Sequence, residues 1–279
     1  MIDQRGSMRL VKSCGAFALL VVALIGLTSA AKVAVSPLGI DFDLLPGATH
    51  FGSFTVKNTG EDAQDITVTL NDYDKAVTGE NRYYPAGTLA YSLATFVTFS
   101  PATFRLEPGR VQEVSFKASL PEEALGPHWM MFFVQESTPT ASTTTEVEGQ
   151  EGGFAFNVNV VFGVQVRQTD PSHRVVDGRV TRIRVETLEG GGWAIRLAFE
   201  NTGTTFLLPK GRVEVRDRTG KTAATIPIEE FRILPGATRE LTVLLEEPLS
   251  PGQYIALGII DFGAEFLVAG QAGFEVKAP

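Results

Sequence analysis

Side chains that could bind a metal ion or move a proton are few in this sequence and scattered along it. The histidines, His50, His128 and His173, fall in different predicted elements, and none stands at a metal-ligand spacing from acidic residues. The run at residues 71–74, Asn-Asp-Tyr-Asp, offers oxygen ligands that suit calcium, but it lacks the glycine and the terminal glutamate of an EF-hand loop. A turn is the better interpretation, and the sequence predicts no metal site.

Covalent catalysis needs an activated nucleophile, and the sequence offers none in a recognisable setting. No Gly-x-Ser-x-Gly element occurs, and the single cysteine, Cys14, precedes an apolar N-terminal run. Glycines 190–192 lie between Val185 and Trp193, a pattern typical of a hairpin turn rather than of a phosphate-binding loop. Carboxylates far apart in the chain can still meet in a fold, but nothing points to such a pair. We predict a protein that is not an enzyme and binds no cofactor.

The remaining chemistry is hydrogen bonding by a strand backbone, and it points to residues 154–167, FAFNVNVVFGVQVR. Every second residue from Phe154 to Val166 is apolar, and successive side chains of a strand point to opposite faces. We predict one long strand with a continuous apolar face. Since strands usually have about 5–6 residues, two interpretations stay open: the face is buried in the protein's own core, or part of it serves another chain.

Length and composition limit the classes of protein that this chain can be. Its 279 residues suggest two domains, and its 44% hydrophobic and 20% charged content is typical of a globular protein. The formal charge of −8, without any cluster of lysine and arginine, excludes a nucleic-acid partner.

The N-terminus has the pattern of a targeting segment. Basic residues precede an apolar run at residues 16–27, and small residues follow at 28–31. This order predicts a secretory signal peptide over residues 1–31, with an uncleaved membrane anchor as the alternative. We therefore expect the protein in the periplasm or at the cell surface, without disulfide bonds.

Short alternating segments separated by turn residues predict strands along the rest of the chain, and no apolar period of 3.6 is sustained. The first strand, 32–42, is interrupted at Pro37, which suits an edge or a switch between sheets. Residues 71–74 open a predicted loop, and the polar stretch 136–153 is a predicted flexible loop.

The second half of the sequence repeats the first in outline. The segment FTVKNTG at 54–60 is echoed by LAFENTG at 197–203, and LEPG at 106–109 is echoed by LPG at 234–236. This spacing is too long for a solenoid repeat. It predicts an all-β protein of two tandem β-sandwich domains, residues 32–168 and 169–279.

Four segments together resemble the periplasmic chaperones of pilus assembly by the chaperone–usher route. They are FSPATFRLEPG at 99–109, the strand end at 58–60, Leu120-Pro121 and the long alternating strand. The resemblance covers most of residues 32–170 and implies two immunoglobulin-like domains, with the long strand lent to an incomplete, β-rich pilin subunit. The strand positions that it assigns to the partner are Phe154, Phe156, Val158 and Val160, while Phe162 and Val164 stay in the protein's own core.

Two positions depart from this family. Its members bind the subunit's terminal carboxylate with a lysine in the long strand and an arginine in the first strand. Here the lysine position is Gly163, and the arginine position falls near Leu38-Gly39. Glycine cannot make a charge-assisted bond to a carboxylate, so Arg167 and Lys32 are the candidate carboxylate anchors.

Three functions follow from these patterns. The first is an exported chaperone-like protein that captures a pilin-like subunit and self-associates through the exposed strand when alone. The alternative is a structural or adhesive surface protein whose sandwiches act as spacers. A third is a carbohydrate-binding module with stacking platforms at Trp129, Trp193, Tyr83 and Tyr84, although core packing explains the tryptophans better.

Overall fold

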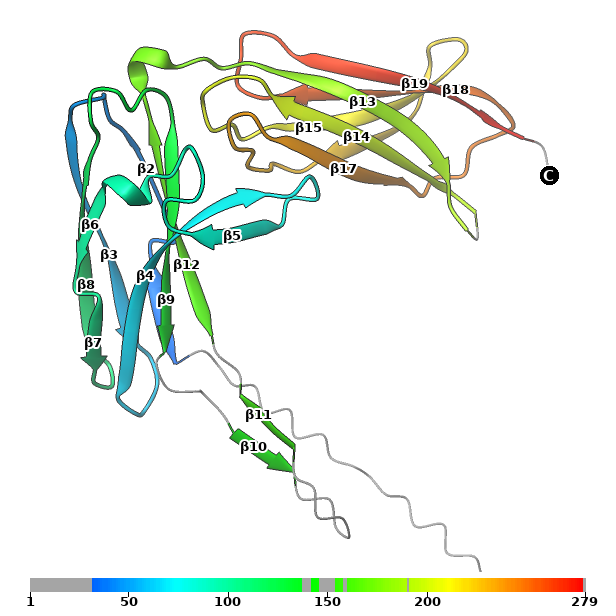
Figure 1. The fold of residues 1–279 in the computed structure, drawn as a ribbon. Coiled ribbons are helices and arrows are strands. Elements are labelled where there is room, and N and C mark those ends of the chain that lie inside the picture. Colours follow the sequence, from blue (N-terminus) through cyan, green and yellow to red (C-terminus); the bar gives the residue numbers. More distant parts are fainter. Residues whose placement is uncertain (1–31, 137–141, 146–153, 158–159, 190, 278–279) are drawn as a thin grey trace, which may run out of the picture. The chain divides into compact units, whose positions relative to one another are not determined.

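A computed structural model of the chain describes residues 32–136, 142–145, 154–157, 160–189 and 191–277. These residues fold as strands joined by turns and loops, and most of them lie in two sandwiches with separate hydrophobic cores (Figure 1). The predicted all-β class with two β-sandwiches is confirmed. The predicted signal peptide, 1–31, lies outside the described residues, and the predicted boundary at 168/169 stays a prediction.

The first sandwich packs two sheets face to face. One sheet has the order β1 (Val33–Ser36), β3 (Thr49–Asn58), β8 (Val111–Ser119), β6 (Val97–Ser100). The other has the order β2 (Gly39–Asp43), β12 (Val161–Thr169), β9 (His128–Glu136), β4 (Gln64–Lys75), β5 (Asn81–Pro85), and β7 (Thr103–Leu106) also pairs with β4. Alternating apolar residues of both sheets, such as Phe54, Phe132 and Val164, are buried between them.

Pro37 stands where the first strand region changes sheets, as predicted. Before it, β1 pairs antiparallel with β3; after it, β2 pairs parallel with β12 in the other sheet. One short stretch of chain therefore closes an edge in each of the two sheets.

The predicted loop at 71–74 is wrong, because β4 continues to Lys75 and pairs there with β5. The side chain of Asp72 has its hydrogen-bond partners outside the sheet. The fully buried Asp72 carboxylate accepts hydrogen bonds from the backbone N–H of Leu89 at 2.8 Å and from the hydroxyl of Ser92 at 2.5 Å. Burial of a carboxylate requires such partners, and they come from a loop that sequence periodicity does not place.

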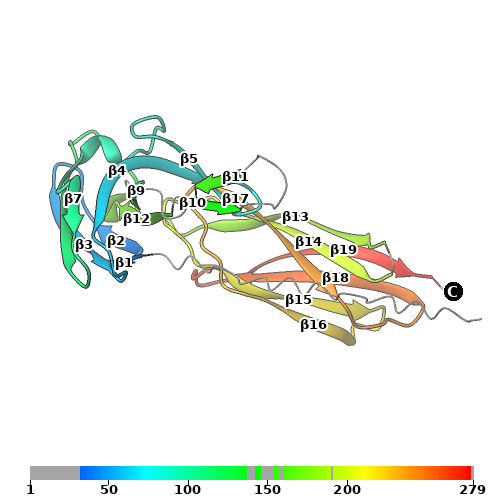
Figure 2. The ribbon, with the colours of Figure 1, turned by 90° about the horizontal axis from the view of Figure 1, so that it is seen from below.

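The second sandwich has a three-stranded and a four-stranded sheet (Figure 2). The first runs β13 (Gly178–Thr187), β14 (Trp193–Asn201), β17 (Thr238–Leu245). The second runs β16 (Thr222–Ile228), β15 (Lys210–Asp217), β18 (Gly252–Asp261), β19 (Val268–Val276). Ile195, Phe199 and Val213 lie at the centre of its core. The predicted hairpin turn near residues 190–192 joins β13 to β14.

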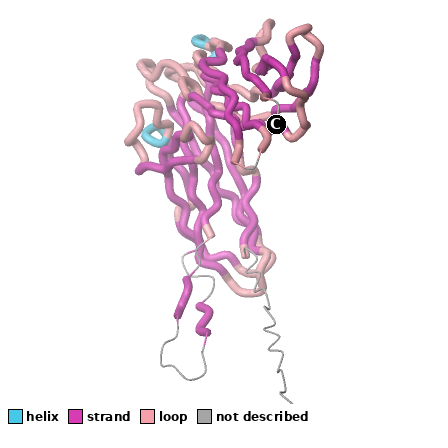
Figure 3. The backbone as a smooth tube through the Cα atoms, turned by 90° about the vertical axis from the view of Figure 1, so that its right-hand side faces the viewer, coloured by secondary structure: helices cyan, strands magenta, loops and turns pink. Residues whose placement is uncertain are grey.

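Helix is confined, in the described residues, to two short 3₁₀ turns, Ala94–Phe96 and Pro171–His173 (Figure 3). No described helix is long and apolar enough to cross a membrane.

The repeated Asn-Thr-Gly segments make the same kind of hydrogen bonds in both sandwiches. Asn58 and Asn201 are fully buried, and each side-chain oxygen accepts the N–H of the glycine two residues on, at 2.9 and 3.0 Å. The amide of Asn58 donates to the carbonyls of Leu106 and Asp62, and that of Asn201 donates to the carbonyl of Thr205. Each asparagine therefore fixes the turn that ends its strand, which explains the internal repeat.

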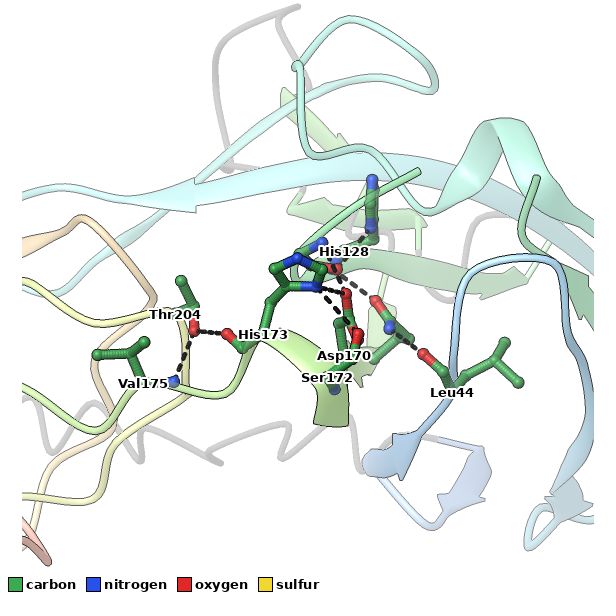
Figure 4. A network of polar contacts seen from close by, with 9 residues as sticks. Leu44, His128, Asp170, Ser172, His173, Val175 and Thr204 are labelled. Carbon is green, nitrogen blue, oxygen red and sulfur yellow. Dashed lines mark hydrogen bonds and ion pairs between the residues drawn. The ribbon is translucent and has the colours of Figure 1, made fainter. Parts of the chain in front are cut away.

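A polar network holds the segment that follows β12 (Figure 4). The carboxylate of Asp170, 1% exposed, accepts hydrogen bonds from the backbone N–H groups of Gly126 and Ser172 at 3.1 and 2.9 Å and contacts Nδ1 of His173 at 2.8 Å. On the other side, the hydroxyl of Thr204 donates to the carbonyl of His173 and accepts the N–H of Val175. The segment is thereby tied to loops of both sandwiches.

Replacing Asp170 with Asn should remove a pH dependence of stability. Burial alone raises the pKa of Asp170, but hydrogen bonds from Ser172, Gly126 and His173 outweigh it and lower this pKa to about 2. A carboxyl with a lowered folded pKa stabilises the protein above its unfolded pKa, and this stability is lost as the pH falls towards 2. Urea unfolding between pH 6 and 2.5 should show that the parent loses on the order of 1–2 kcal/mol more than Asp170→Asn. Parallel curves for the two proteins would contradict this role.

Candidate functional site

The alternating stretch 154–167 is not one strand, and that prediction is wrong. The structure divides it into β11 (Phe154–Asn157) and β12, with residues 158 and 159, and therefore Val158, outside the described residues. β11 pairs with β10 (Ser142–Thr145), a strand within the predicted flexible loop, in a two-stranded sheet of their own.

The division is visible in the register of the two strand pairs. β9 and β12 pair Gln135 with Val161, and β10 and β11 pair Ser142 with Asn157. Between these pairs one side of the hairpin advances by seven residues and the other by four. The two strand pairs therefore do not share one register, and they belong to separate sheets.

One edge of β12 is open in its first half. The N–H of Gln165 donates to the carbonyl of Leu38, and β2 pairs with β12 from Gln165 to Thr169 only. Successive residues of a strand point their backbone groups to alternate sides, so the groups of Gly163 and Val161 face the same side as those of Gln165. No described strand pairs with them there, and the side chain of Val161 is 46% exposed.

The side chains of the even-numbered residues of β12 pack in the protein's own core. Val164 and Val166 are fully buried, and Phe162 is partly buried against the same core cluster. The structure thus places Phe162 and Val164 where the sequence predicted them. Val160 is partly exposed, and for Phe154 and Phe156 the structure describes the backbone in β11.

Neighbouring side chains fill the space above both glycines at the expected anchor positions. A Cβ atom on Gly163 would lie 2.6 Å from Sδ of Met131, and one on Gly39 would lie 2.9 Å from a terminal nitrogen of Arg167. The guanidinium of Arg167 therefore lies over Gly39, the place from which a first-strand arginine would project.

Arg167 is 4% exposed and forms a two-point ion pair with Asp41 of β2, at 2.5 and 3.0 Å. A second guanidinium, that of Arg232, lies 3.8 Å from the same carboxylate. The buried hydroxyl of Tyr73 lies in the field of the Arg167 charge. Two arginines thus share one aspartate.

Electrostatics in this cluster follow from burial and from the shared charge. Burial raises the pKa of Asp41, but the hydrogen bond and charge of Arg167, with the charge of Arg232, lower it further, so the net shift is downward. Burial lowers the pKa of Arg232, and the neighbouring charge of Arg167 lowers it too. Burial raises the pKa of the Tyr73 hydroxyl, which stays neutral. The cluster keeps an excess of positive charge.

Lys32, the other predicted anchor, lies elsewhere. Its ammonium is 3.5 Å from the carboxylate of Asp62, and its side chain packs on Gly60. The structure therefore does not bring Lys32 and Arg167 to one carboxylate. Arg232 is the cation that sequence reasoning missed, because it lies in the turn region between β16 and β17, where no periodicity or motif marks it.

The described residues contain neither a metal-binding cluster nor a proton relay at His173, and Trp129 is not available as a stacking platform. No group of three or more His, Asp or Glu there could hold a metal ion. Ser172 and Asp170 both contact Nδ1 of His173, so the ring cannot pass a proton from one to the other. Trp129 is 3% exposed and donates its indole N–H to the carbonyl of Tyr73, which leaves no open face for a sugar.

No family model matches this sequence. No curated protein matches it either. Among solved structures, the chain is similar to the class 5 fimbrial chaperone CfaA, with 11% identity over 88% of this chain and 99% of that one and a TM-score of 0.46. It is similar to the Escherichia coli chaperone DraB, with 15% identity over 88% and 98% of the two chains and a TM-score of 0.42.

A third similar chain belongs to the CsuC–CsuE chaperone–tip subunit complex of the archaic chaperone–usher Csu pili of Acinetobacter baumannii. The identity is 10% over 88% of this chain and 99% of that one, with a TM-score of 0.45. All three identities are below 25%, and all three TM-scores are below 0.5.

Replacing Asp41 with Asn should leave the buried guanidinium of Arg167 without its counter-charge. We expect a loss of about 1–3 kcal/mol in the free energy of unfolding, below the range for a fully buried pair because the Asp41 side chain is 52% exposed. In Arg167→Met the same Asp41→Asn change should cost much less, and a double-mutant cycle by urea unfolding measures this coupling. Equal costs in both backgrounds would show that the pair is not coupled.

Proposed function

We propose that this chain is an exported, chaperone-like binding protein that captures a pilin-like, β-rich subunit by strand donation. The observation that carries the proposal is the open backbone edge of β12 at Val161–Val164, which leads into the alternating residues of β11. It acts by binding rather than by catalysis, without cofactor or nucleic acid. Its signal peptide directs it to the periplasm.

The physical basis is the addition of a strand to an unfinished sheet. Backbone N–H and C=O groups along the donated stretch pair with the partner's backbone and supply affinity, while alternate side chains fill pockets and supply specificity. The donated side chains are Phe154, Phe156, Val158 and Val160, which share one parity. An open apolar edge invites pairing with any exposed strand, so the free protein self-associates through the same stretch.

A partner carboxylate would be held by the excess positive charge around Asp41. Arg167 is nearly inaccessible at 4% exposed, so it acts by orienting Asp41 and supplying field, whereas Arg232, at 29% exposed, is open to a ligand. Lys32, at 33% exposed, remains a separate candidate anchor beside β1. Charge-assisted bonds of this kind are strong and directional.

A structural or adhesive role is the second candidate, and one observation favours it. β10 already occupies one backbone edge of β11, so only its other edge is open to a partner. If that edge is not used, the two sandwiches act as spacers at the cell surface.

Strand donation predicts a parity rule for mutations. Phe156→Asp with Val158→Asp should abolish partner capture, because both charges enter the partner's apolar groove. The matched control is Ala155→Asp with Asn157→Asp, which places the same charges on the opposite parity and should retain capture. The measurement is purification of each form from the cell envelope, with quantification of the co-eluting subunit by mass spectrometry.

Capture that survives Phe156→Asp with Val158→Asp in a folded protein would rule out donation of this stretch. Loss of capture in both double variants would show that capture needs this segment but does not depend on which alternate side chains are apolar. That result would also contradict the proposal. Unfolding curves of all forms establish that the sandwiches stay folded.

A further inference from the structure

The second sandwich is closed along one side and open along the other. On the closed side, β13 and β19 approach so closely that a Cβ atom on Gly270 would lie 2.7 Å from Val180. On the open side, β17 ends the three-stranded sheet and β16 ends the four-stranded one, with a groove between them. In the part of the chain that the structure describes, no strand pairs with the outer edge of β17.

The backbone of β17 is oriented for a further strand. The N–H of Asn201 in β14 donates to the carbonyl of Ala237, so the backbone N–H and C=O groups of odd-numbered residues in this segment point towards β14. The backbone groups of even-numbered residues point away from β14. Glu240 shows this, because its N–H donates to the carbonyl of Val77 at 2.7 Å. The backbone groups of Thr242 and Leu244 point the same way, both residues are exposed, and no described strand pairs with them.

The two edges of the groove differ in their protection. β16 carries Pro227, which has no N–H to offer and blocks pairing in the manner of many natural edge strands. β17 contains no proline, and its penultimate residue, Leu244, is 50% exposed. An additional strand at this side of the sandwich would therefore pair with β17 rather than with β16.

The floor of the groove is apolar. Ile226, Phe231 and Leu241 line it and are only partly buried, although each packs against the core of the second sandwich. The tip of the β4–β5 hairpin reaches one end of the groove, where Thr78 is part of the lining and Val77 accepts the bond from Glu240. Beyond this tip the groove holds no described segment.

Arg239 gives the groove a charge preference. Its guanidinium lies against Gly79, and its Nε and one terminal nitrogen are buried with no hydrogen-bond partner among the described residues. Burial lowers the pKa of Arg239, and the charge of Glu80 raises it less. Arg196, the other arginine of the lining, is already bound to Glu186. Glu229, Glu230 and Glu240 also line the groove and form no ion pair with Arg239, so the charge of Arg239 is not neutralised by an ion pair among the described residues.

We infer that β17 and this groove bind an extended segment of a protein partner that carries alternating apolar residues and one acidic side chain. The segment adds a fourth strand antiparallel to β17, takes backbone bonds from Thr242 and Leu244, and covers Ile226 and Leu241. Its carboxylate pairs with Arg239. This site receives a strand, whereas the edge at β12 gives one, and the two do not depend on each other.

The probe for this site is a synthetic peptide, acetyl-Thr-Val-Thr-Val-Thr-Asp-Thr-amide, titrated into the isotope-labelled full chain. We expect saturable shifts of the Thr242 and Leu244 amide resonances and binding about tenfold tighter than that of the same peptide with Asn in place of Asp. In Arg239→Gln the two peptides should bind equally.

The edge itself is tested by Thr242→Pro, which removes an N–H that the sheet does not use and should abolish binding. The matched control, Thr242→Val, keeps the N–H and should bind normally. If Thr242→Pro fails to fold, Leu244→Pro makes the same test at the next outward residue. Phe156→Asp should leave peptide binding unchanged, which separates this site from strand donation.

Three outcomes would overturn the inference. They are no binding up to about 1 mM peptide, binding that survives the proline variants, and equal affinity of both peptides for the parent. A dimer of the free chain that Thr242→Pro dissociates would assign the edge to a second copy of the protein instead.

Discussion

A strand at the end of a sheet leaves a row of backbone N–H and C=O groups without a strand partner, and this constraint governs where the chain can meet another protein. The first strand region is divided at Pro37, so that β1 closes the edge of β3 and β2 closes the edge of β12. Because β2 begins only at Gly39, it covers β12 from Gln165 onwards and leaves Val161–Val164 open. The extent of one short strand thus decides how much of β12 is available.

Two glycines show how a charge can be supplied from a neighbouring strand. Gly39 leaves room for the guanidinium of Arg167, and Gly163 leaves room for the side chain of Met131. A side chain at either position would displace its neighbour. The positive charge near Gly39 therefore comes from Arg167 in β12. Asp41 holds the Arg167 guanidinium in place, and its Oδ2 atom also lies near the guanidinium of Arg232.

Much of the fold could be predicted from the sequence, because most strands bury one face and so alternate. The alternation at Phe162, Val164 and Val166 placed their side chains correctly, and the echo of Asn58 in Asn201 marked two turns with the same hydrogen bonds. These features depend on residues close together in the chain, which is why the sequence reveals them.

The parts that could not be predicted depend on partners far away in the chain. The acidic run at 71–74 has turn-like residues, yet it is strand because β5 pairs with it and because Ser92 and Leu89 satisfy Asp72. The stretch 154–167 contributes to two strand pairs of different register, which alternation on one strand cannot show. Arg232 reaches Asp41 from the other half of the chain, and no local pattern announces such a contact.

Hydrogen exchange of the protein purified with its captured subunit, compared with the protein alone, tests strand donation most directly. Amides that join a new ladder exchange more slowly because their hydrogen bonds must open first. The account predicts new protection within residues 154–160 and at the outward-facing amides of Val161 and Gly163 in the complex, with no change at Gln165–Thr169, where β2 already pairs. A bound subunit that leaves exchange at Phe154–Val164 unchanged would contradict it.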